Sequence, residues 1–426
     1  MNINVALLRA ELPKLIVLKS LIFLSTFPFI LLLDFKTSTV FLQTLAGVTG
    51  YVGLILFVWQ VVLGSRFLIS KFTNGILKII KLHKWLGIWA TVLVIFHPIF
   101  QMLAFFEGIS WLFIPGFDTP REISITYGRV AFCIFLIIFL SSKLIRKNFS
   151  YRIWLRVHYL AYPMLFLALE HAFSIGILGD QYPALKALVG TLILGFNILV
   201  FFRLAFWAGF FKTKYVIVAK EIFDDQLLLT LETKFKAVST LPGQYIYLQN
   251  RALGEAHPFS ILDNSQNGQS IQLLIKIQGH FTQALATKNI GESVALDGPY
   301  GDFGQNLKSE NNLVLIAGGV GISSLPQIGR AHSGNSVLIW CLRNPPNDAL
   351  EKPIQENFGE RYFKFVSSNN NHLQNSDITS ILKTNNFDPK ITKFLICGSK
   401  KFNKSLIEIL KNLEIPKSNI LTEKYN

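Results

Sequence analysis

Four of the eight histidines lie in two long apolar stretches in the first half of the chain. His83 and His97 fall in one stretch, and His158 and His171 fall in another. Polar side chains are costly at membrane depth and usually face a bundle interior or a site. Imidazole is a common axial ligand of haem iron and can act from inside a helix bundle, so these histidines are candidate haem ligands. The alternative is that one or two of them are interfacial or hydrogen-bonded helix histidines.

The spacing of these histidines fits two haem sites at two depths. The separations are 97 − 83 = 14 and 171 − 158 = 13 residues, which is roughly 20 Å along a helix. Both stretches are predicted to begin at the same membrane face, so His83 is level with His158, and His97 is level with His171. Two residues that are 14 apart, such as His83 and His97, lie close to the same face of a helix. Two residues that are 13 apart, such as His158 and His171, do not. We therefore expect a kink or π-bulge near Pro163.

A second set of candidate residues lies in the second half of the chain. It consists of three short motifs, His257-Pro-Phe-Ser, Gly279-His-Phe-Thr and Gly298-Pro-Tyr-Gly. A flavin needs a hydroxyl or backbone donor near N5, an aromatic wall, and amides or hydroxyls for its pyrophosphate. Side chains of these types occur in this order, and they are Phe259, Ser260, Phe281 and Thr282. The ordered set predicts a flavin site, although each motif alone is a weak signal.

A glycine-rich turn, Ala317-Gly-Gly-Val-Gly-Ile-Ser-Ser, directly follows the apolar run Leu313–Ile316. Such a turn between a strand and a helix lets the backbone approach a phosphate, although it can equally be a packing turn. Cys397-Gly-Ser follows another apolar run, and the chain ends Glu423-Lys-Tyr-Asn. A terminal aromatic residue is by default part of a frayed end.

The elements that position the histidines are predicted membrane spans. Of the 426 residues, 51% are hydrophobic and only 16% are charged, and the apolar stretches of roughly 20 residues needed to span a bilayer all precede about Phe211. No small-residue cleavage site follows the first stretch, so it is predicted to remain as a span. Six spans are predicted, over residues 15–33, 40–63, 79–105, 128–142, 153–174 and 183–207.

The charge pattern indicates membrane topology rather than nucleic-acid binding. Residues 1–211 hold 18 Lys and Arg against 7 Asp and Glu, so +11 of the net +15 lies in the apolar half. Basic residues gather in the connections 66–81, 143–156 and 212–214, which places these connections, both termini and the second half in the cytoplasm. The three cysteines, Cys133, Cys341 and Cys397, are too few for a disulfide framework or a zinc site.

The second half is predicted to form two further domains. Short β-like runs such as Leu227–Leu231 and Ile271–Ile275, separated by polar turns, predict an antiparallel barrel. After about Leu307, buried-strand runs such as Leu313–Ala317 alternate with helical stretches, which predicts a parallel α/β sheet. The expected domains are a six-helix transmembrane haem bundle over 1–211, a β-barrel FAD domain over 212–307 and a nicotinamide-binding α/β domain over 308–426.

These motifs, in this order, resemble the ferric reductase and NADPH oxidase superfamily, and most closely its compact prokaryotic NADPH oxidase-like members. The resemblance covers nearly the whole chain and implies a six-helix haem domain joined to a ferredoxin-NADP reductase-like dehydrogenase. It implies that His83 and His158 bind an inner haem b and that His97 and His171 bind an outer one. The FAD residues that it implies are His257, Pro258, Phe259, Ser260, Gly279, Phe281 and Thr282. The nicotinamide residues that it implies are Gly318, Gly319, Gly321, Ser323 and Cys397.

The resemblance also implies that Ser260, Cys397 and the terminal aromatic Tyr425, which would stack on the flavin, are catalytic. Where the family usually has Thr-Pro after the glycine turn, this chain has Ser323-Ser324, and Tyr425 is followed by one more residue. Arg343 resembles a position that contacts the extra phosphate of NADPH, which favours NADPH over NADH. An arginine after a strand is, however, more often a solvated surface charge.

The predicted activity is electron transfer from cytoplasmic NAD(P)H, through FAD and two haems, to a small acceptor on the outer side of the plasma membrane. Dioxygen, giving superoxide, and a ferric chelate are both acceptors that the sequence allows. No obligatory protein partner is expected besides the lipid membrane. The alternatives are a haem or ion permease and an intramembrane reductase of quinone or of a partner protein.

Overall fold

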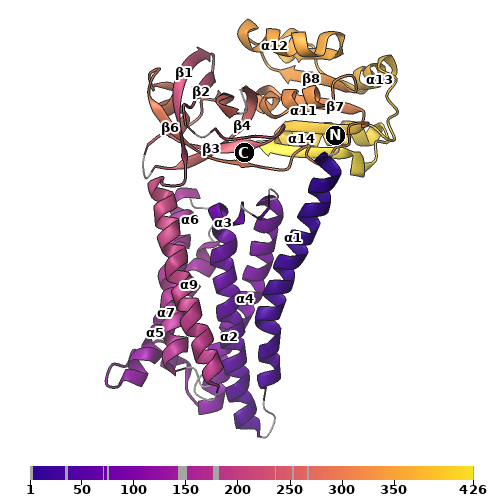
Figure 1. Cartoon of the computed structure of the whole chain (residues 1–426). Coiled ribbons are helices and arrows are strands. Elements are labelled where there is room, and N and C mark those ends of the chain that lie inside the picture. The colour runs from indigo at the N-terminus through magenta and orange to yellow at the C-terminus, as the bar shows by residue number, and fades with distance from the viewer. Residues whose placement is uncertain are drawn as a thin grey trace. The chain divides into compact units, whose positions relative to one another are not determined.

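The structure is a computed structural model of the 426-residue chain (Figure 1). It describes residues 3–33, 37–70, 72–73, 76–142, 151–175, 182–235, 237–251, 254–265 and 268–425. The chain divides into two compact units, one of Leu12–Phe206 and one of Trp207–Asn426 together with Met1–Glu11. Most of the predicted basic connection 143–156 lies outside the described residues.

The first part of the chain is helical. Its elements are α1 (Ile3–Thr26), η1 (Phe27–Leu32), α2 (Ser38–Gly64), α3 (Arg66–Ile69), α4 (Ile76–Phe105), η2 (Ile109–Leu112), α5 (Pro120–Leu140), α6 (Tyr151–His158), α7 (Ala161–Ile175) and α9 (Pro183–Ala208). Within the described ranges, 5 helices are long and apolar enough to cross a membrane, namely Lys14–Leu32, Ser38–Gly64, Lys78–Phe105, Pro120–Leu140 and Pro183–Ala208. The chain is therefore an integral membrane protein.

Two predicted spans begin earlier in the structure than the sequence indicated. The first helix, α1, starts at Ile3 rather than near residue 15 and ends at Thr26, where a 3-10 turn follows. The fourth, α5, starts at Pro120 rather than at 128. The Thr119 side chain caps α5 by accepting a hydrogen bond from the Glu122 amide at 3.2 Å. Charged residues in the first turn concealed this start, because hydropathy marks only the apolar part of a helix.

The predicted fifth span, 153–174, is not one helix. It is α6 followed by α7, with a break at Tyr159 and Leu160. Pro163 has no N–H to donate to the Tyr159 carbonyl, which instead accepts from the Tyr162 amide at 3.1 Å. The interruption predicted near Pro163 is confirmed, and it takes the form of a helix break rather than a π-bulge.

Helix pairs α2–α4 and α5–α7 make the main contacts of the membrane part. Leu165 and Leu169 of α7 are fully buried in a core that includes Phe135 of α5 and Tyr51 of α2. Helices of both pairs therefore contribute to a single packed core, and two of them, α4 and α7, also carry histidines.

The predicted antiparallel barrel is confirmed. It is closed, with the strand order β1-β2-β5-β4-β3-β6. The strands are β1 (Thr213–Phe223), β2 (Gln226–Glu232), β3 (Tyr245–Gln249), β4 (Ala256–Ser265), β5 (Ser270–Lys276) and β6 (Ser293–Tyr300). In β2, alternate residues from Leu227 to Leu231 are fully buried, as expected for a strand with one face on the barrel interior. The short helix α10 (His280–Ala286) covers the stretch between β5 and β6.

The predicted parallel α/β sheet is also confirmed. Its strands are β7 (Leu313–Gly318), β8 (Ser336–Leu342), β9 (Tyr362–Val366), β10 (Lys393–Ser399) and β11 (Ile420–Tyr425), in the order β11-β10-β7-β8-β9. The helices that accompany them are α11 (Pro326–Ala331), α12 (Asp348–Phe358), α13 (Asn375–Thr384) and α14 (Lys400–Asn412). The barrel and this sheet share a buried cluster that joins Leu262 and Leu274 to Leu315 and Trp340.

The C-terminus is an ordered edge strand rather than a frayed end. The backbone of β11 pairs in parallel with β10, from Phe394 opposite Ile420 to Ser399 opposite Tyr425. The side chain of Tyr425 lies outside the described residues, so its predicted stacking on a flavin stays a prediction.

Candidate functional site

The structure brings the four membrane histidines together as two pairs. The ring centres of His83 on α4 and His158 on α6 are 6.3 Å apart, with ring planes at 62°. Those of His97 on α4 and His171 on α7 are 6.2 Å apart, with planes at 80°. The pairing by depth inferred from the sequence is therefore the pairing found in the structure.

The rings of His97 and His171 are each held by one backbone carbonyl. Nδ1 of His97 lies 2.8 Å from the carbonyl oxygen of Ala46 on α2. Nδ1 of His171 lies 2.9 Å from the carbonyl oxygen of Ser124 on α5. A carbonyl can only accept, so Nδ1 carries the proton in both rings and Nε2 is left as a free electron-pair donor. In this tautomer Nε2 is the nitrogen that can bind a metal ion.

Glycines make room for these rings. A Cβ at Gly50 of α2 would lie 2.7 Å from Nδ1 of His97, and a Cβ at Gly128 of α5 would lie 2.6 Å from Nδ1 of His171. Such close contacts do not occur with a real Cβ atom, so each ring lies directly on a helix backbone. In both cases the glycine lies four residues after the residue whose carbonyl accepts the hydrogen bond. We call each combination of carbonyl and glycine the seat of its histidine ring, and the two seats are built alike.

Helix α2 contacts His83 in a different way, through the backbone of the histidine rather than through its ring nitrogen. Gln60 donates from Nε2 to the backbone carbonyl of His83 at 2.9 Å, and a Cβ at Gly64 would lie 3.8 Å from Cε1 of His83. Gln60 follows Ala46 by 60 − 46 = 14 residues, which is the separation of His83 and His97. The ring of His158 also stacks on Trp154, with centres 5.0 Å apart. Sequence reasoning did not identify these supporting residues.

The pairs have the geometry for one iron ion each. An imidazole nitrogen lies about 2 Å from a metal ion that it binds and roughly 1.1 Å from its own ring centre, so two imidazoles that held one ion between them would have ring centres about 6.2 Å apart. The observed 6.3 and 6.2 Å match this value. The free Nε2 atoms of the outer pair and the glycine seats fit the same ligand role, so these residues fit two haem groups.

The second candidate region lies on β4 of the barrel. The ring of Phe281 is stacked between two residues of the His257-Pro-Phe-Ser motif, with centres 4.2 Å from that of His257 and 6.0 Å from that of Phe259. Ser260 is buried and pairs with Tyr245 of β3. Two of the three predicted motifs are thus adjacent and form an aromatic wall beside a buried hydroxyl.

The predicted phosphate residues lie at the start of α10. Gly279 precedes this helix with φ of +85°, a conformation that favours glycine. The Thr282 hydroxyl accepts from the Gln278 amide at 2.7 Å and lies 3.2 Å from the Gly279 carbonyl. Thr282 therefore shapes this turn, which leaves the direct phosphate contact predicted for it as a prediction.

The glycine-rich turn forms the 3-10 helix η5 (Gly319–Ser324), which packs against β4, β5 and β10. A Cβ at Gly321 would lie 2.1 Å from the Cys397 carbonyl oxygen, so this glycine is needed for close packing. Ser323 is buried, and its hydroxyl donates to the Val320 carbonyl at 2.8 Å. The flavin motif on β4 and the cysteine motif on β10 thus meet at the same turn.

Cys397 is fully buried beside a carboxyl group that the sequence analysis overlooked. Its Sγ lies 3.8 Å from Oε2 of Glu423 on the neighbouring strand β11. Burial raises the pKa of Glu423 to about 7, with a further rise from Asp302, while hydrogen bonds from Cys397 and Ser324 oppose the shift. This cluster can therefore hold or release a proton near neutral pH.

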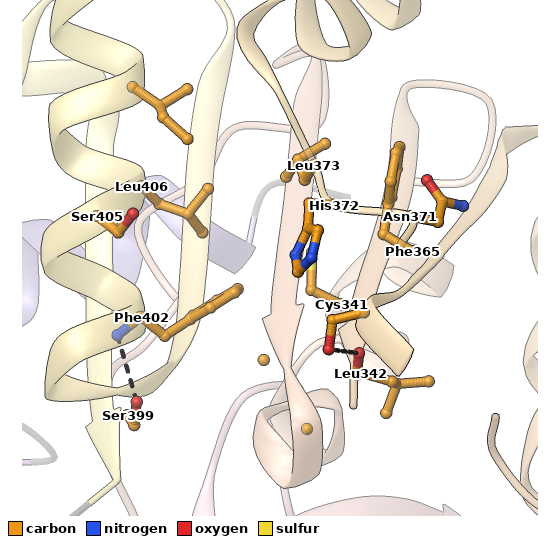
Figure 2. Close-up of a pocket in the computed structure, with 14 residues that line it drawn as sticks. Cys341, Leu342, Phe365, Asn371, His372, Leu373, Ser399, Phe402, Ser405 and Leu406 are labelled. Atoms are coloured by element: carbon orange, nitrogen blue, oxygen red, sulfur yellow. Dashed lines mark hydrogen bonds between the residues drawn. The ribbon is translucent and has the colours of Figure 1, made fainter. Parts of the chain in front are cut away.

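A pocket opens at the carboxyl ends of β7, β8, β9 and β10 (Figure 2). It has a volume of about 440 Å³, and Gly318 and Gly319 form part of its wall. Figure 2 shows the rings of His372 and Phe402 on facing sides of the space. A Cβ at Gly318 would lie 2.7 Å from the Phe402 ring. Ligands of open α/β sheets bind at this edge, where the strand order reverses.

Arg343 lies one residue beyond β8, and its side chain is exposed. Its carbonyl accepts from the Ser368 amide at 2.9 Å. The pocket is lined by its neighbours Cys341 and Leu342 but not by Arg343. Burial raises the pKa of the Cys341 thiol to about 12, so this cysteine is a poor nucleophile.

The fold and these sites define a membrane-embedded histidine bundle joined to a reductase of the barrel and parallel-sheet type. Residues 49–169 match the family described as ferric reductase like transmembrane component, and residues 211–303 match an FAD-binding domain. The predicted resemblance to the ferric reductase and NADPH oxidase superfamily is thereby confirmed.

Three relatives illustrate this resemblance. Ferric/cupric reductase transmembrane component 7 of Saccharomyces cerevisiae is 29% identical over 198 residues, which cover 44% of this chain and 30% of that protein. The probable cell surface ferric reductase kap2 of Aspergillus oryzae is 23% identical over 80% of this chain and 50% of its own length. A superoxide-generating NADPH oxidase heavy chain of Dictyostelium discoideum is 27% identical over 58% of this chain and 36% of its own length. The chain thus spans half or less of these relatives.

Proposed function

We propose that this protein is an NAD(P)H-dependent oxidoreductase that moves electrons across the membrane to a small acceptor. The observation that carries the proposal is the presence of two imidazole pairs, each spaced for one iron, at two depths of the bundle. When bound, FAD would accept a hydride from the nicotinamide, and two haems b would conduct single electrons.

In this proposal the bundle residues hold and tune the two haem sites. His83 and His158 are the inner ligands, and His97 and His171 are the outer ligands. Each histidine pair would hold one haem iron, and the bound haem would supply one-electron transfer toward the acceptor. The carbonyl bonds to Nδ1 of the outer ligands fix their tautomer and orientation.

The reductase residues bind and position the other two cofactors. We assign His257, Pro258, Phe259 and Ser260 of β4 to the flavin ring, with Phe281 behind them and Gly279 and Thr282 near its phosphates. The glycines at the pocket wall, Gly318 and Gly319, let the nicotinamide nucleotide approach the backbone. Gly321 and Ser323 hold the turn against Cys397, which would lie at the nicotinamide with Ser260 and Tyr425. Arg343, which follows the lining residues Cys341 and Leu342 in the sequence, would favour NADPH.

The proposed orientation places the bundle end at which α9 leads into the reductase on the cytoplasmic side of the plasma membrane. Basic residues in the described connections at this end support it, because such residues accumulate on the cytoplasmic side. They are Arg66, Lys78, Lys81, Arg156 and Lys212. The opposite end then faces the acceptor.

Cofactor content and acceptor assays test the proposal. The purified full-length protein should contain two haems b, measured as pyridine haemochrome, and one FAD per chain. With NADPH it should produce superoxide or reduce a ferric chelate, and the comparison of the two rates selects the acceptor. Protein that carries neither haem nor flavin would instead favour the permease alternative. Reduction of quinone alone would favour the intramembrane reductase.

The seat of the outer histidine gives a first prediction. Gly128→Ala would place a methyl group 2.6 Å from Nδ1 of His171, which should displace the ring and break its bond to Ser124. We expect haem retention at the outer site to weaken by about 10–100-fold, as for loss of a supporting contact of a metal ligand. The control Gly195→Ala on α9 meets nothing within 4 Å and should keep the full haem content. Equal haem content in both variants would contradict the seat.

The buried Glu423 gives a second prediction, on pH. Its pKa is raised from 4.5 to about 7 in the folded protein, so the folded state holds the proton more tightly than the unfolded state. Stability should therefore fall as pH rises from 4.5 to about 7, by about 3 kcal/mol at most. Glu423→Gln mimics the protonated form and should unfold at higher temperature than the parent at pH 8 but not at pH 4.5. The unfolding temperature is measured from the rise in flavin fluorescence as flavin is released on heating. If Glu423→Gln raised the unfolding temperature equally at pH 8 and at pH 4.5, the prediction would be wrong.

A further inference from the structure

The connection between α4 and α5, residues 106–119, folds back along α5. We call this segment the hook. It lies at the end of the bundle where α5 and α9 begin, opposite the end at which α9 terminates (Figure 1). Thr126 of α5 accepts from the Gly116 amide at 2.9 Å and donates to the Gly116 carbonyl at 2.8 Å. The guanidinium of Arg129 donates to the Ile114 carbonyl and lies over the Trp111 ring, 4.6 Å from its centre.

The tethering residues share one face of α5. Glu122, Thr126 and Arg129 are spaced i, i+4 and i+7, which aligns them on a helix. A Cβ at Gly116 would lie 3.2 Å from Cβ of Glu122, and Glu122 also accepts from the Asp118 amide at 3.2 Å. A polar stripe on the first turns of α5 therefore holds the hook against the helix.

The depth of this contact follows from the length of α5. The 21 residues Pro120–Leu140 extend about 31 Å, which equals the hydrocarbon thickness of roughly 30 Å. Thr126 lies six residues, or roughly 9 Å, inside the start of the helix. The backbone of Gly116 bonds there, so the hook lies alongside the first two turns of α5 rather than beyond the start of the helix.

The side chains of the hook suit that depth. Residues 108–117 contain no charged residue, and the two charged residues of the hook, Glu107 and Asp118, lie near its ends. The large apolar side chains that face outward are Phe106 (91% exposed), Ile109 (74%), Phe113 (55%), Ile114 (60%) and Phe117 (66%). They continue the exposed apolar surface of the adjoining helices, such as Leu103 of α4 and Val130 of α5. A patch of this kind on a protein surface marks a membrane or partner contact.

Part of the hook backbone is hydrogen-bonded within the protein, and such bonds matter in an apolar medium, where each unpaired polar group is costly. The amides of Glu107, Trp111 and Phe113 donate to the carbonyls of Met102, Gly108 and Ser110, each at 3.0 Å. Further contacts of the hook are those with Glu122, Thr126 and Arg129 of α5. We propose that the hook is a re-entrant segment that is inserted into the far leaflet of the bilayer, where its exposed apolar side chains pack against lipid acyl chains.

Photo-crosslinking of the full-length protein in lipid nanodiscs tests this proposal. Benzoylphenylalanine is introduced at position 113 of the hook. Matched probes are placed at 137, where Ile137 of α5 is 51% exposed in mid-span, and at 121, where Arg121 is exposed at the start of α5. Lipid adducts at 113 should match those at 137 and exceed those at 121 several-fold. A yield at 113 as low as at 121, or crosslinked dimers in place of lipid adducts, would overturn the proposal.

A second variant tests the tether. Thr126→Val keeps the shape of the side chain but loses both hydrogen bonds to Gly116. The lipid adduct at 113 should then decrease toward the level at 121, while the adduct at 137 stays unchanged. An unchanged adduct at 113 would overturn the part of the proposal that assigns the polar stripe as the anchor of the hook.

Discussion

His97→Ala should stop electron delivery to the far-side acceptor while NAD(P)H oxidation by a soluble dye continues. The substitution removes one of two imidazoles whose ring centres are 6.2 Å apart, so the outer haem would lose an axial ligand. The inner pair of His83 and His158 would keep both ligands. Haem content should fall from two to about one per chain, and superoxide or ferric-chelate reduction should fall by more than about 100-fold. A dye that accepts directly from flavin does not need the bundle, so its reduction should persist.

Two further variants locate the effect. His83→Ala should abolish far-side transfer as well, and it should also prevent NAD(P)H from reducing the haem that remains. Asn197→Ala is the matched control, since Asn197 is a polar residue of α9 whose amide bonds to its own helix, at the Ile193 carbonyl. It should retain both haems and the full rate. Two haems and full far-side transfer in His97→Ala would show that the ligand assignment is wrong.

The histidine pairs could be predicted from the sequence because depth follows from the alternation of spans and from residue counts. The seats of the outer rings could not. Ala46 and Gly50 are about 50 residues from His97 in the sequence, and nothing local shows that α2 packs on α4. The break after His158 was foreseen only as a region, because Pro163 removes a hydrogen bond without specifying where the helix ends.

In the reductase part, continuous apolar runs predicted the central strands β7, β8 and β10. The strands β4, β9 and β11 were overlooked because each contains polar residues. His257 and Pro258 interrupt β4, Lys364 interrupts β9, and Glu423 lies in β11. The omission of β11 affected the site. A C-terminal segment predicted to be frayed gives no reason to expect that Glu423 is buried beside another residue. The pairing of β11 with β10 places Glu423 opposite Cys397, and only the sheet order reveals this.

Gly321→Ala should disable the reductase site more severely than an alanine substitution at any other glycine of the turn that leads into η5. The added Cβ would lie 2.1 Å from the Cys397 carbonyl oxygen and 2.7 Å from its carbon. Both atoms are backbone of the buried strand β10, so no side-chain rotation can relieve the collision. The turn η5 and β10 would have to separate. Overpacking of a buried site costs about 1–3 kcal/mol or more, and here the displaced residue is itself Cys397, next to Glu423.

The expected result for Gly321→Ala is a loss of NAD(P)H-dependent dye reduction by about 100-fold or more, because a shift of about 1 Å at a positioned group can have this effect. Gly334→Ala is the matched control. Gly334 has φ of +93° in the turn before β8, and a Cβ added there would have no atom within 4 Å. The alanine would therefore add backbone strain of about 1–2 kcal/mol without a collision. Its unfolding temperature should fall slightly and its dye reduction should remain. Haem content should be the same in both variants, which separates a local defect in the reductase from general misfolding. If the two variants reduced dye at equal rates, close packing of η5 on β10 would not be required for hydride transfer, and Cys397 would lose its proposed place at the nicotinamide.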